Sequence, residues 1–306
     1  MIICDFFYIF AAMKQVRPKK NLGQHFLTDL NIAKRIADTV DACPDIPVLE
    51  VGPGMGVMTQ YLVEKPRPFK VVEIDRESVE YLKGTLFSRE YGGTEVRGYE
   101  NTPAADISRA TAPTHHRPTE LPIIEGDFLR MDLRTVFDGQ QFVLTGNYPY
   151  DISSQIFFKM LDNKDLIPCC TGMIQHEVAV RMASKPGNKQ YGILSVLIQA
   201  WYNVEYLFTV EPGVFNPPPK VQSAVIRMTR NEVTDLGCDE QLFRRVVKTT
   251  FNQRRKMLRV SLRQIFDAAH PAPAGFFDDE MMTRRPEQLS IPEFIELTNK
   301  IAGAMP

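Results

Sequence analysis

The sequence predicts a doubly wound, mostly parallel α/β sheet followed by a small, all-helical C-terminal domain. Residues 48–230 alternate short apolar runs with segments of helical period, which is the pattern of repeated βαβ units. A glycine-rich loop follows the first apolar run, at the position where doubly wound sheets bind their ligands. After residue 230 the apolar runs stop and helical periodicity alone remains.

Seven apolar runs are expected to form strands. The first five belong to the alternating region, so we expect them to run parallel to one another. The last two are interpreted as a hairpin-like pair at the edge of the sheet. The seven runs are residues 47–51, 69–74, 122–126, 141–144, 171–174, 203–210 and 223–230.

Domain boundaries follow from changes in this pattern. Residues 1–18 are expected to form an N-terminal extension without fixed structure, and residues 19–232 the ligand-binding α/β domain. Residues 233–306 are expected to be a helical domain, because segments 241–266 and 286–303 have helical period. Residues 84–120 combine Gly, Pro, Thr and His with weak periodicity, so we interpret them as an insertion.

Composition narrows the classes of function. The chain has 306 residues, 44% apolar residues and a net charge of −1, typical of a soluble globular protein. Its five cysteines lack CxxC or zinc-site spacing, so we expect reduced thiols in the cytoplasm and no disulfide framework. No metal site is expected, and His115 and His116 are interpreted as exposed loop residues. The apolar residues 1–12 are too short to cross a membrane and lack the basic start of a signal peptide.

The glycine loop, LEVGPGMGVMTQYL, has Gly52, Gly54 and Gly56 at alternate positions. Glycines allow backbone conformations that a Cβ forbids, and they let a ligand approach the main chain. A dinucleotide fingerprint needs G-x-G-x-x-G/A, but its sixth position here is Val57. The loop fits the G-x-G-x-G pattern of S-adenosylmethionine enzymes instead, with a plain strand–turn–helix corner as the alternative.

Two acidic residues follow the next two strands. Glu73 ends the second strand, 17 positions after Gly56, at the spacing of an acid that binds ribose hydroxyls. Asp127 ends the third strand, where its carboxylate can accept a hydrogen bond from an adenine amine beside Phe128. Each acid alone is better explained as a solvated strand end or a helix cap. Together with the glycine loop they predict a nucleoside site.

The segment TGNYPYDISSQ, residues 145–155, follows the fourth strand, which is expected to lie next to the first. Asn147 can accept a hydrogen bond from an adenine N6 amine through its side-chain oxygen, and Tyr148 can accept another through its main-chain oxygen. Pro149 fixes the turn, and Tyr150 offers a face for stacking on a base. The alternative is a strand-ending turn with an aromatic plug.

These motifs resemble the small-subunit ribosomal RNA adenine N6,N6-dimethyltransferase family. Other similar stretches are KKNLGQHFLTD, QHEVAVRM, KQYGILSVLIQ, FNPPPKVQSAVIRM and FNQRRKMLRVSL. The resemblance implies a Rossmann-like methyltransferase sheet and an S-adenosylmethionine-dependent enzyme. It implies dimethylation of two adjacent adenosines near the 3′ end of small-subunit ribosomal RNA during ribosome biogenesis, with the immature small subunit as partner. We expect a cytoplasmic monomer that does not contact membranes.

The resemblance also assigns roles to single residues. Phe215 is implied to cover the flipped target base, with a simple loop anchor as the alternative. Tyr148 stands where the family usually has Leu or Ile, which puts the shape of the pocket in doubt. The catalytic turn is Asn147, Tyr148, Pro149 and Tyr150. The implied cofactor-binding residues are His25 and Leu27 at the methionine side, Gly52, Gly54 and Gly56 beneath the cofactor, Glu73 at the ribose, Asp127 at the adenine, and Asn147.

A basic stripe occupies residues 244–263, which contain eight Lys or Arg and no acid. On a chain of near-zero net charge, such a stripe is an electrostatic footprint for phosphate, with a solvated helix face as the alternative. We therefore predict RNA contacts at Arg254, Arg255 and Lys256.

Three other functions are considered. A large-subunit ribosomal RNA methyltransferase of the resistance type is disfavoured by the NPPPKV and FNQRRK segments. A nicotinamide dehydrogenase is disfavoured by Val57 and by the lack of a general-acid constellation near the loop. A non-catalytic RNA-binding assembly factor does not explain the intact set of Gly52, Glu73, Asp127 and Asn147.

Overall fold

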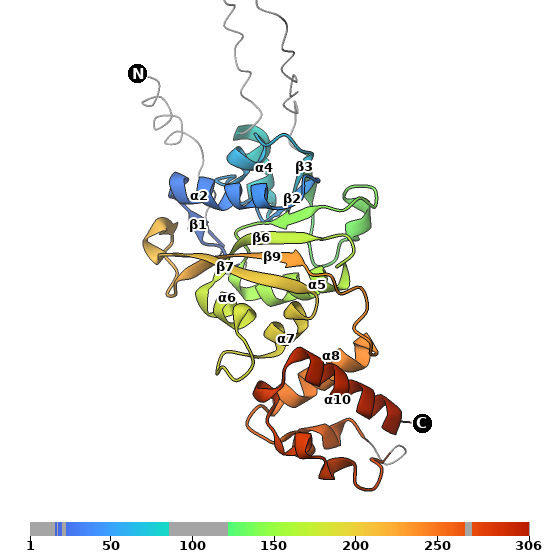
Figure 1. Cartoon of the computed structure of the whole chain (residues 1–306). Helices are drawn as coiled ribbons and strands as arrows, with labels where there is room; N and C mark the ends of the chain where they lie inside the picture. The colour runs from blue at the N-terminus through green and yellow to red at the C-terminus, as the bar shows by residue number, and fades with distance from the viewer. Residues whose placement is uncertain (1–15, 17, 20–22, 86–121, 267–270, 306) are drawn as a thin grey trace, which may run out of the picture.

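The computed structural model describes residues 16, 18–19, 23–85, 122–266 and 271–305. The predicted extension at residues 1–18 and the insertion at 84–120, with His115 and His116, lie almost entirely outside the described residues. In the described part, a twisted sheet with helices on both sides continues into a group of C-terminal helices (Figure 1). The predicted fold class is confirmed.

The central sheet is built from seven strands of the described residues: β2 (Val48–Val51), β3 (Phe69–Glu73), β4 (Ile123–Glu125), β5 (Val143–Thr145), β6 (Cys169–Gln175), β7 (Tyr202–Val210) and β9 (Ser223–Arg230). Their order is β4-β3-β2-β5-β6-β9-β7. Strands β4 to β6 in this order are parallel, whereas β9 and β7 are antiparallel to their neighbours. The seven predicted strands are confirmed, and the late pair forms the antiparallel end of the sheet.

The centre of the parallel part is β2, which pairs with β3 on one side and with β5 on the other. The chain leaves β2 to build β3 and β4 in one direction, and then returns to place β5 on the opposite side. Loops that diverge in this way leave a crevice at the carboxyl ends of the strands. The glycine loop after β2 and the turn after β5 both begin at this crevice.

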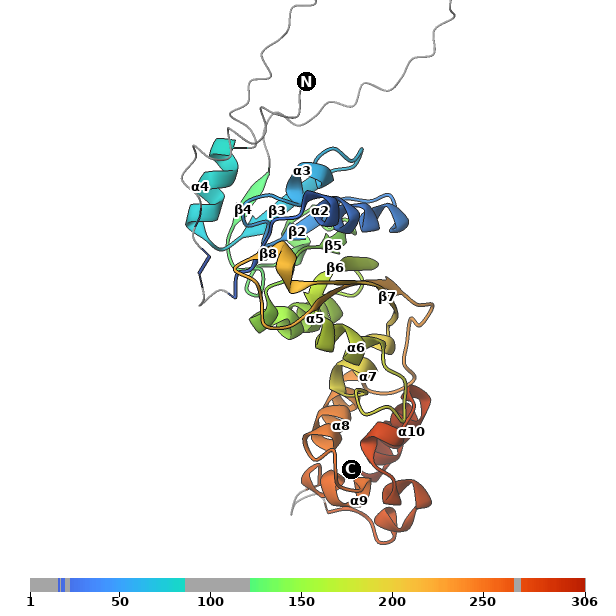
Figure 2. The ribbon, with the colours of Figure 1, turned by 90° about the vertical axis from the view of Figure 1, so that its left-hand side faces the viewer.

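Alternate residues of the strands feed two separate cores, as the period of a strand requires. In β5, Val143 packs into one core and Leu144 into the other, and Cys169 and Cys170 of β6 divide in the same way. The two groups of helices lie on opposite sides of the sheet (Figure 2). The core that contains Val143 and Cys169 is covered by α2 (Leu30–Ala37) and α3 (Thr59–Leu62). The core that contains Leu144 and Cys170 is covered by α5 (Ser153–Asp162), α6 (His176–Ala183) and α7 (Ile193–Gln199). Helix α4 (Arg76–Thr85) follows β3.

A second, two-stranded sheet was not predicted. It pairs β1 (Phe26–Leu27) with β8 (Phe215–Asn216) in antiparallel register, with Leu27 opposite Phe215. The side chain of Thr28 and its main-chain N–H both donate to the main-chain oxygen of Val214. The N-terminal motif is thereby held against the loop that follows β7, close to the carboxyl edge of the main sheet.

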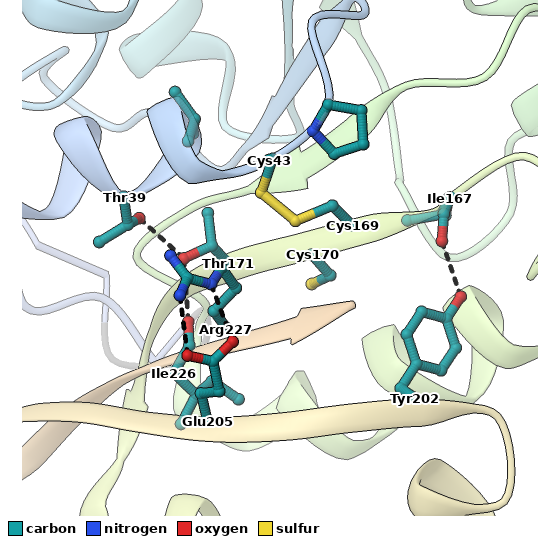
Figure 3. Close-up of a disulfide and its surroundings, with 12 residues drawn as sticks. Thr39, Cys43, Ile167, Cys169, Cys170, Thr171, Tyr202, Glu205, Ile226 and Arg227 are labelled. Atoms are coloured by element: carbon teal, nitrogen blue, oxygen red, sulfur yellow. Dashed lines mark hydrogen bonds and ion pairs between the residues drawn. A yellow bond between two sulfur atoms is a disulfide. The ribbon is translucent and has the colours of Figure 1, made fainter. Parts of the chain in front are cut away.

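The expectation of reduced thiols without a disulfide is wrong for one pair. Cys43, just after the 3₁₀ helix η2 (Asp38–Ala42), is bonded to Cys169 at the start of β6 (Figure 3). Both residues belong to the core that α2 covers, and their Cα atoms are 5.8 Å apart. Sequence spacing could not reveal the pair, because 126 residues separate the two cysteines. Cys170 and Cys238 are free.

The C-terminal part consists of α8 (Glu240–Asn252), α9 (Leu258–Ser261), α10 (Ile291–Ala304) and short 3₁₀ turns. The helical period over 241–266 corresponds to α8 and α9, which are separated where the chain turns at residues 253–257, and Leu258 after the turn is buried. The core of these helices is continuous with the core beneath the sheet, so the domain boundary after residue 232 stays a prediction. Within the described ranges, every helix is too short or too polar to cross a bilayer.

Candidate active site at the carboxyl edge of the sheet

A cavity of about 230 Å³ opens at the carboxyl ends of β2, β3, β4 and β5. The loops after these strands line it, together with the β1 segment. Gly56 and Phe215, two of the predicted site residues, do not line it. Ten others do: His25, Leu27, Gly52, Gly54, Glu73, Asp127, Asn147, Tyr148, Pro149 and Tyr150.

The glycine loop has left-handed backbone at Gly52, Gly54 and Gly56, with φ of +66°, +56° and +76°. Residues other than glycine rarely adopt this backbone conformation. At Gly54 there is also no room, because a Cβ would lie 2.9 Å from the ring of Phe26. The main chain of the loop is thus exposed to a ligand on one side and packed against β1 on the other.

Glu73 holds the loop and the end of its own strand together. Its side chain is buried, and its two carboxylate oxygens accept the N–H groups of Gly54 at 3.0 Å and Asp75 at 2.8 Å. Burial raises the pKa of Glu73, and the two main-chain donors oppose that rise. Each oxygen keeps a further acceptor position, so the fixed carboxylate can accept hydroxyl hydrogens from a ligand in the cavity.

Glu50 also lines the cavity, and the sequence analysis missed it. It is 1% exposed, and one carboxylate oxygen accepts the hydroxyl of Thr59 at 2.7 Å. Burial raises its pKa to about 8; the hydrogen bond from Thr59 opposes the rise and the nearby Glu73 adds to it. A charged residue inside an apolar strand, directly before the glycine loop, is the signal that could have revealed it.

Asp127 caps the turn after β4, where one carboxylate oxygen accepts the N–H of Leu129 at 2.8 Å. The other oxygen lies 3.4 Å from the Nε of Arg130, whose side chain is 89% exposed, and the Asp127 side chain itself stays 32% exposed. Apolar side chains flank it in the cavity, namely Phe128, Leu129 and Ile74. Ile74 is 54% exposed, which is unusual for an isoleucine at the end of a buried strand. The sequence analysis missed Ile74, although an apolar residue directly after Glu73 was visible there.

The turn after β5 presents two acceptor oxygens. The side-chain N–H of Asn147 donates to the main-chain oxygen of His25 at 3.2 Å, so the amide oxygen is left without a donor among the described residues. The main-chain N–H of Tyr148 donates to Met173 on β6 at 3.0 Å. No hydrogen bond among the described residues uses the main-chain oxygen of Tyr148. Both residues line the cavity, and oxygens without internal partners there are suited to bind a donor on a ligand.

Tyr150 is held by its hydroxyl and by one face of its ring. Its hydroxyl is hydrogen-bonded to that of Ser223, and its ring stacks on His25 with centroids 5.5 Å apart. The Nδ1 atom of His25 lies 2.8 Å from the main-chain oxygen of Pro217. Burial raises the pKa of Tyr150, which keeps its hydroxyl protonated. One face of the phenol ring is therefore covered by His25.

The other predicted contacts lie away from the cavity. Phe215 is 4% exposed and packs in the core with Leu27, its partner across β1 and β8. Arg254, Arg255 and Lys256 lie in the turn between α8 and α9, not on a helix face. Arg255 and Lys256 are exposed, whereas Arg254 donates to the main-chain oxygen of Asn188 at 3.3 Å.

Comparisons with known proteins identify the family of the chain. The family model "Ribosomal RNA adenine dimethylase" matches residues 15–96 and 107–298. The chain is 61% identical to "Ribosomal RNA small subunit methyltransferase A" of Phocaeicola vulgatus, over 96% of this chain and 92% of the relative. It is 60% identical to the Bacteroides thetaiotaomicron protein of the same name, over 96% of this chain and 97% of the relative.

Solved structures agree in fold. A dimethyladenosine transferase from Plasmodium falciparum matches with a TM-score of 0.69 and 20% identity, covering 92% of this chain and 98% of the other. The 23S rRNA methyltransferase ErmE matches with a TM-score of 0.56 and 23% identity, over 90% and 99%. The family model and the close relatives extend over nearly the whole chain. The protein therefore belongs to the ribosomal RNA adenine dimethylase family.

Proposed function

We propose that this protein transfers methyl groups from S-adenosylmethionine to N6 of two adjacent adenosines near the 3′ end of small-subunit ribosomal RNA. The relatives at about 60% identity carry the name of a small-subunit enzyme, which supports this choice of RNA. The observation that carries the chemistry is the pair of acceptor oxygens on the turn after β5, the side-chain oxygen of Asn147 and the main-chain oxygen of Tyr148.

The cavity fits the proposed cofactor. Gly52 and Gly54 present main chain without side chains to the cavity, and Glu73 is fixed by two N–H groups with acceptor positions left for ribose hydroxyls. Asp127 lies between apolar walls suited to an adenine ring. His25 and Leu27 are proposed at the methionine end, and Gly56 shapes the loop from below. The bound cofactor supplies a methyl group already activated by its sulfonium, so a metal or a cysteine nucleophile is not needed.

The residues of the turn are proposed to activate the target amine. The lone pair of an exocyclic adenine amine is delocalised into the ring, which makes the nitrogen a poor nucleophile. Oxygens of Asn147 and Tyr148 accept its two hydrogens and draw the nitrogen toward tetrahedral geometry, which frees the lone pair. As N6 forms the new N–C bond at the expense of the methyl–sulfur bond, positive charge develops on N6 beside these two oxygen dipoles, and it is neutralised when N6 loses a proton to water. Pro149 limits the motion of the turn, so the dipoles are positioned before the reaction.

Tyr150 is proposed to stack on the target base. Its ring is backed by His25 and tethered to Ser223, so the base stacks on the face that His25 does not cover. Base stacking on such an aromatic contributes about 1–3 kcal/mol. Phe215 stays a predicted cover for the base. In its present position the ring packs against Leu27, so this role requires the ring or its loop to move.

The exposed cations Arg255 and Lys256 are proposed to bind RNA phosphates. The turn between α8 and α9 presents them on the surface without a salt bridge to another described residue. Arg254 is proposed to contribute less, because it contacts Asn188 and lies 3.7 Å from Glu287. Changing all three residues to Ala is expected to reduce the salt dependence of RNA binding. The protein is proposed to act in the cytoplasm as a monomer on immature small subunits.

A large-subunit enzyme of the resistance type is the second candidate, since ErmE shares the fold. The deciding experiment measures tritiated methyl transfer from S-adenosylmethionine to unmethylated small subunits, to large subunits and to naked ribosomal RNA. We expect incorporation into small subunits alone, approaching four methyl groups per particle. Equal labelling of large subunits, or none of any substrate, contradicts the proposal. Binding of immature subunits without methyl transfer would identify a non-catalytic assembly factor.

A further inference from the structure

The side chain of Tyr148 has a role of its own in the structure. It is fully buried, and its hydroxyl donates to the main-chain oxygen of Thr171 at 2.9 Å. The same hydroxyl lies 3.2 Å from the thiol sulfur of Cys170. Both partners belong to β6, the strand next to the turn. The phenol therefore reaches from the turn back to the neighbouring strand.

Two hydrogen bonds to β6 hold Tyr148, one from its main-chain N–H and one from its side chain. Its main-chain N–H donates to the oxygen of Met173 at 3.0 Å, and its hydroxyl donates to Thr171, two residues earlier on the same strand. The N–H of Met173 in turn donates to the oxygen of Gly146 at 2.9 Å. These bonds use the main-chain N–H and the hydroxyl of Tyr148, and they leave its main-chain oxygen without a hydrogen-bond donor.

The space for the phenol ring is built by a glycine. Gly172 has a φ of +140°, and a Cβ there would lie 2.8 Å from the ring of Tyr148 and 2.3 Å from the oxygen of Gly146. Phe157 of α5 closes the other side, with its ring edge-on at a centroid distance of 5.5 Å. The ring is thus enclosed by a strand that lacks a side chain at the contact and by a covering helix. A tyrosine held so closely transmits the position of β6 to its own main chain.

We propose that the phenol of Tyr148 is a positioning group, which holds the main-chain oxygen of the same residue where the target amine is accepted. The inference rests on the proposed function, because that function assigns the oxygen its ligand. A leucine or isoleucine at this position has no hydroxyl and cannot donate to Thr171. The hydroxyl therefore gives this chain a fixed turn through a hydrogen bond to β6 that aliphatic residues cannot make.

The test compares Tyr148→Phe with Tyr202→Phe. Tyr202 is a matched control, since it is 1% exposed and its hydroxyl donates to the main-chain oxygen of Ile167 at 2.8 Å (Figure 3). Neither Tyr202 nor Ile167 lines the cavity. Three quantities are measured for each variant: the melting temperature, the Kd of S-adenosylmethionine, and kcat and KM on small subunits. Each variant loses one buried hydrogen bond, so both are expected to melt a few degrees lower, by about 2–4 °C.

The two variants are expected to differ in kcat. Tyr148→Phe lowers kcat about tenfold, because small displacements of a reacting group are costly, while KM and the cofactor Kd stay within about twofold. Tyr202→Phe leaves kcat within about twofold. Cys170→Ala removes one partner of the hydroxyl without altering Tyr148, and an intermediate loss of about threefold in kcat is expected; this variant decides the case if Tyr148→Phe does not fold.

Two outcomes overturn the inference: an equal effect of Tyr148→Phe and Tyr202→Phe on kcat, or a loss confined to KM. If Tyr148→Phe does not fold, an unchanged kcat in Cys170→Ala overturns it. Failure of the proposed function has a different signature, because wild-type protein would then leave small subunits unmethylated.

Discussion

The side-chain amide of Asn147 donates to the main-chain oxygen of His25, and this bond of 3.2 Å fixes which end of the amide faces the cavity. His25 directly precedes β1, which is held by β8, so two short strands far apart in the chain help to determine the direction of the amide. The amide oxygen is thereby available as an acceptor before any substrate binds. Such preorganised acceptors are more effective than groups that must turn during the reaction.

Replacing Asn147 is expected to abolish most of the activity. Asn147→Ala removes the acceptor, and we expect kcat to fall by about 10²–10³-fold. Asn147→Asp keeps an oxygen but places a carboxylate against the oxygen of His25, so we expect a similar loss through misorientation. Single-turnover methyl transfer at saturating RNA measures both. A rate within twofold of wild type in either variant contradicts the assigned role.

Glu73→Gln is expected to weaken cofactor binding. The amide can accept only through one oxygen, so either Gly54 or Asp75 loses its acceptor and the ribose hydroxyls lose a charged partner. Hydrogen bonds to a charged group contribute about 1.5–3 kcal/mol, so the Kd of S-adenosylmethionine should rise about 10- to 100-fold. Glu77→Gln is the control, because the Glu77 side chain is 61% exposed and does not line the cavity. Calorimetric titration gives both constants, and equal values for the two variants contradict the prediction.

The buried Glu50 is expected to make stability depend on pH. Its pKa is about 8 in the folded protein, against an ordinary value of 4.5 for an exposed carboxyl, so between these values the folded state binds more protons than the unfolded state. Stability from this group is therefore complete below pH 4.5 and is lost as pH rises toward 8, by at most about 1.4 kcal/mol per pH unit. Glu50→Gln does not titrate. Denaturant unfolding at pH 5, 6.5 and 8 gives the free energy of unfolding of both proteins. The variant should become more stable relative to wild type as the pH rises, and a constant difference contradicts the assignment.

The three cations of the turn between α8 and α9 are expected to differ in role, with Arg255 and Lys256 binding RNA phosphates and Arg254 stabilising the fold. Arg255→Ala with Lys256→Ala should lower the slope of log K against log salt by about 1.5, as two phosphate contacts are lost. Arg254→Ala should change the slope less and lower the melting temperature, because it loses its contacts with Asn188 and Glu287. The double change Arg76→Ala and Lys83→Ala on α4 is a control of equal charge. Equal slopes for the two double variants contradict the assignment.

The strands and the residues at their ends could be predicted because both leave local signals. Apolar runs with flanking glycine or proline located the strands, and parallel strands necessarily bring their carboxyl ends to one edge. That argument was sufficient to bring Glu73, Asp127 and Asn147 to the same cavity.

Other features depend on contacts that are distant in sequence. Strands of two residues, such as β1 and β8, have no period to detect, and the burial of Phe215 follows from their pairing. The bond between Cys43 and Cys169 depends on how η2 packs against the sheet. The turn at Arg254 interrupts a helical pattern because Leu258 is drawn into the core, a tertiary effect that local propensity does not contain.

The pairing of β1 with β8 has a consequence for biosynthesis. Leu27 is among the first residues of the described chain to leave the ribosome, whereas Phe215 follows only after the sheet from β2 to β7 has been translated. The orientation of the Asn147 amide depends on β1 being in place. A nascent chain that lacks residues 215–216 has its glycine loop but not the partner strand of β1, so with the role proposed for Asn147 we expect competence to act on RNA to arise late in translation.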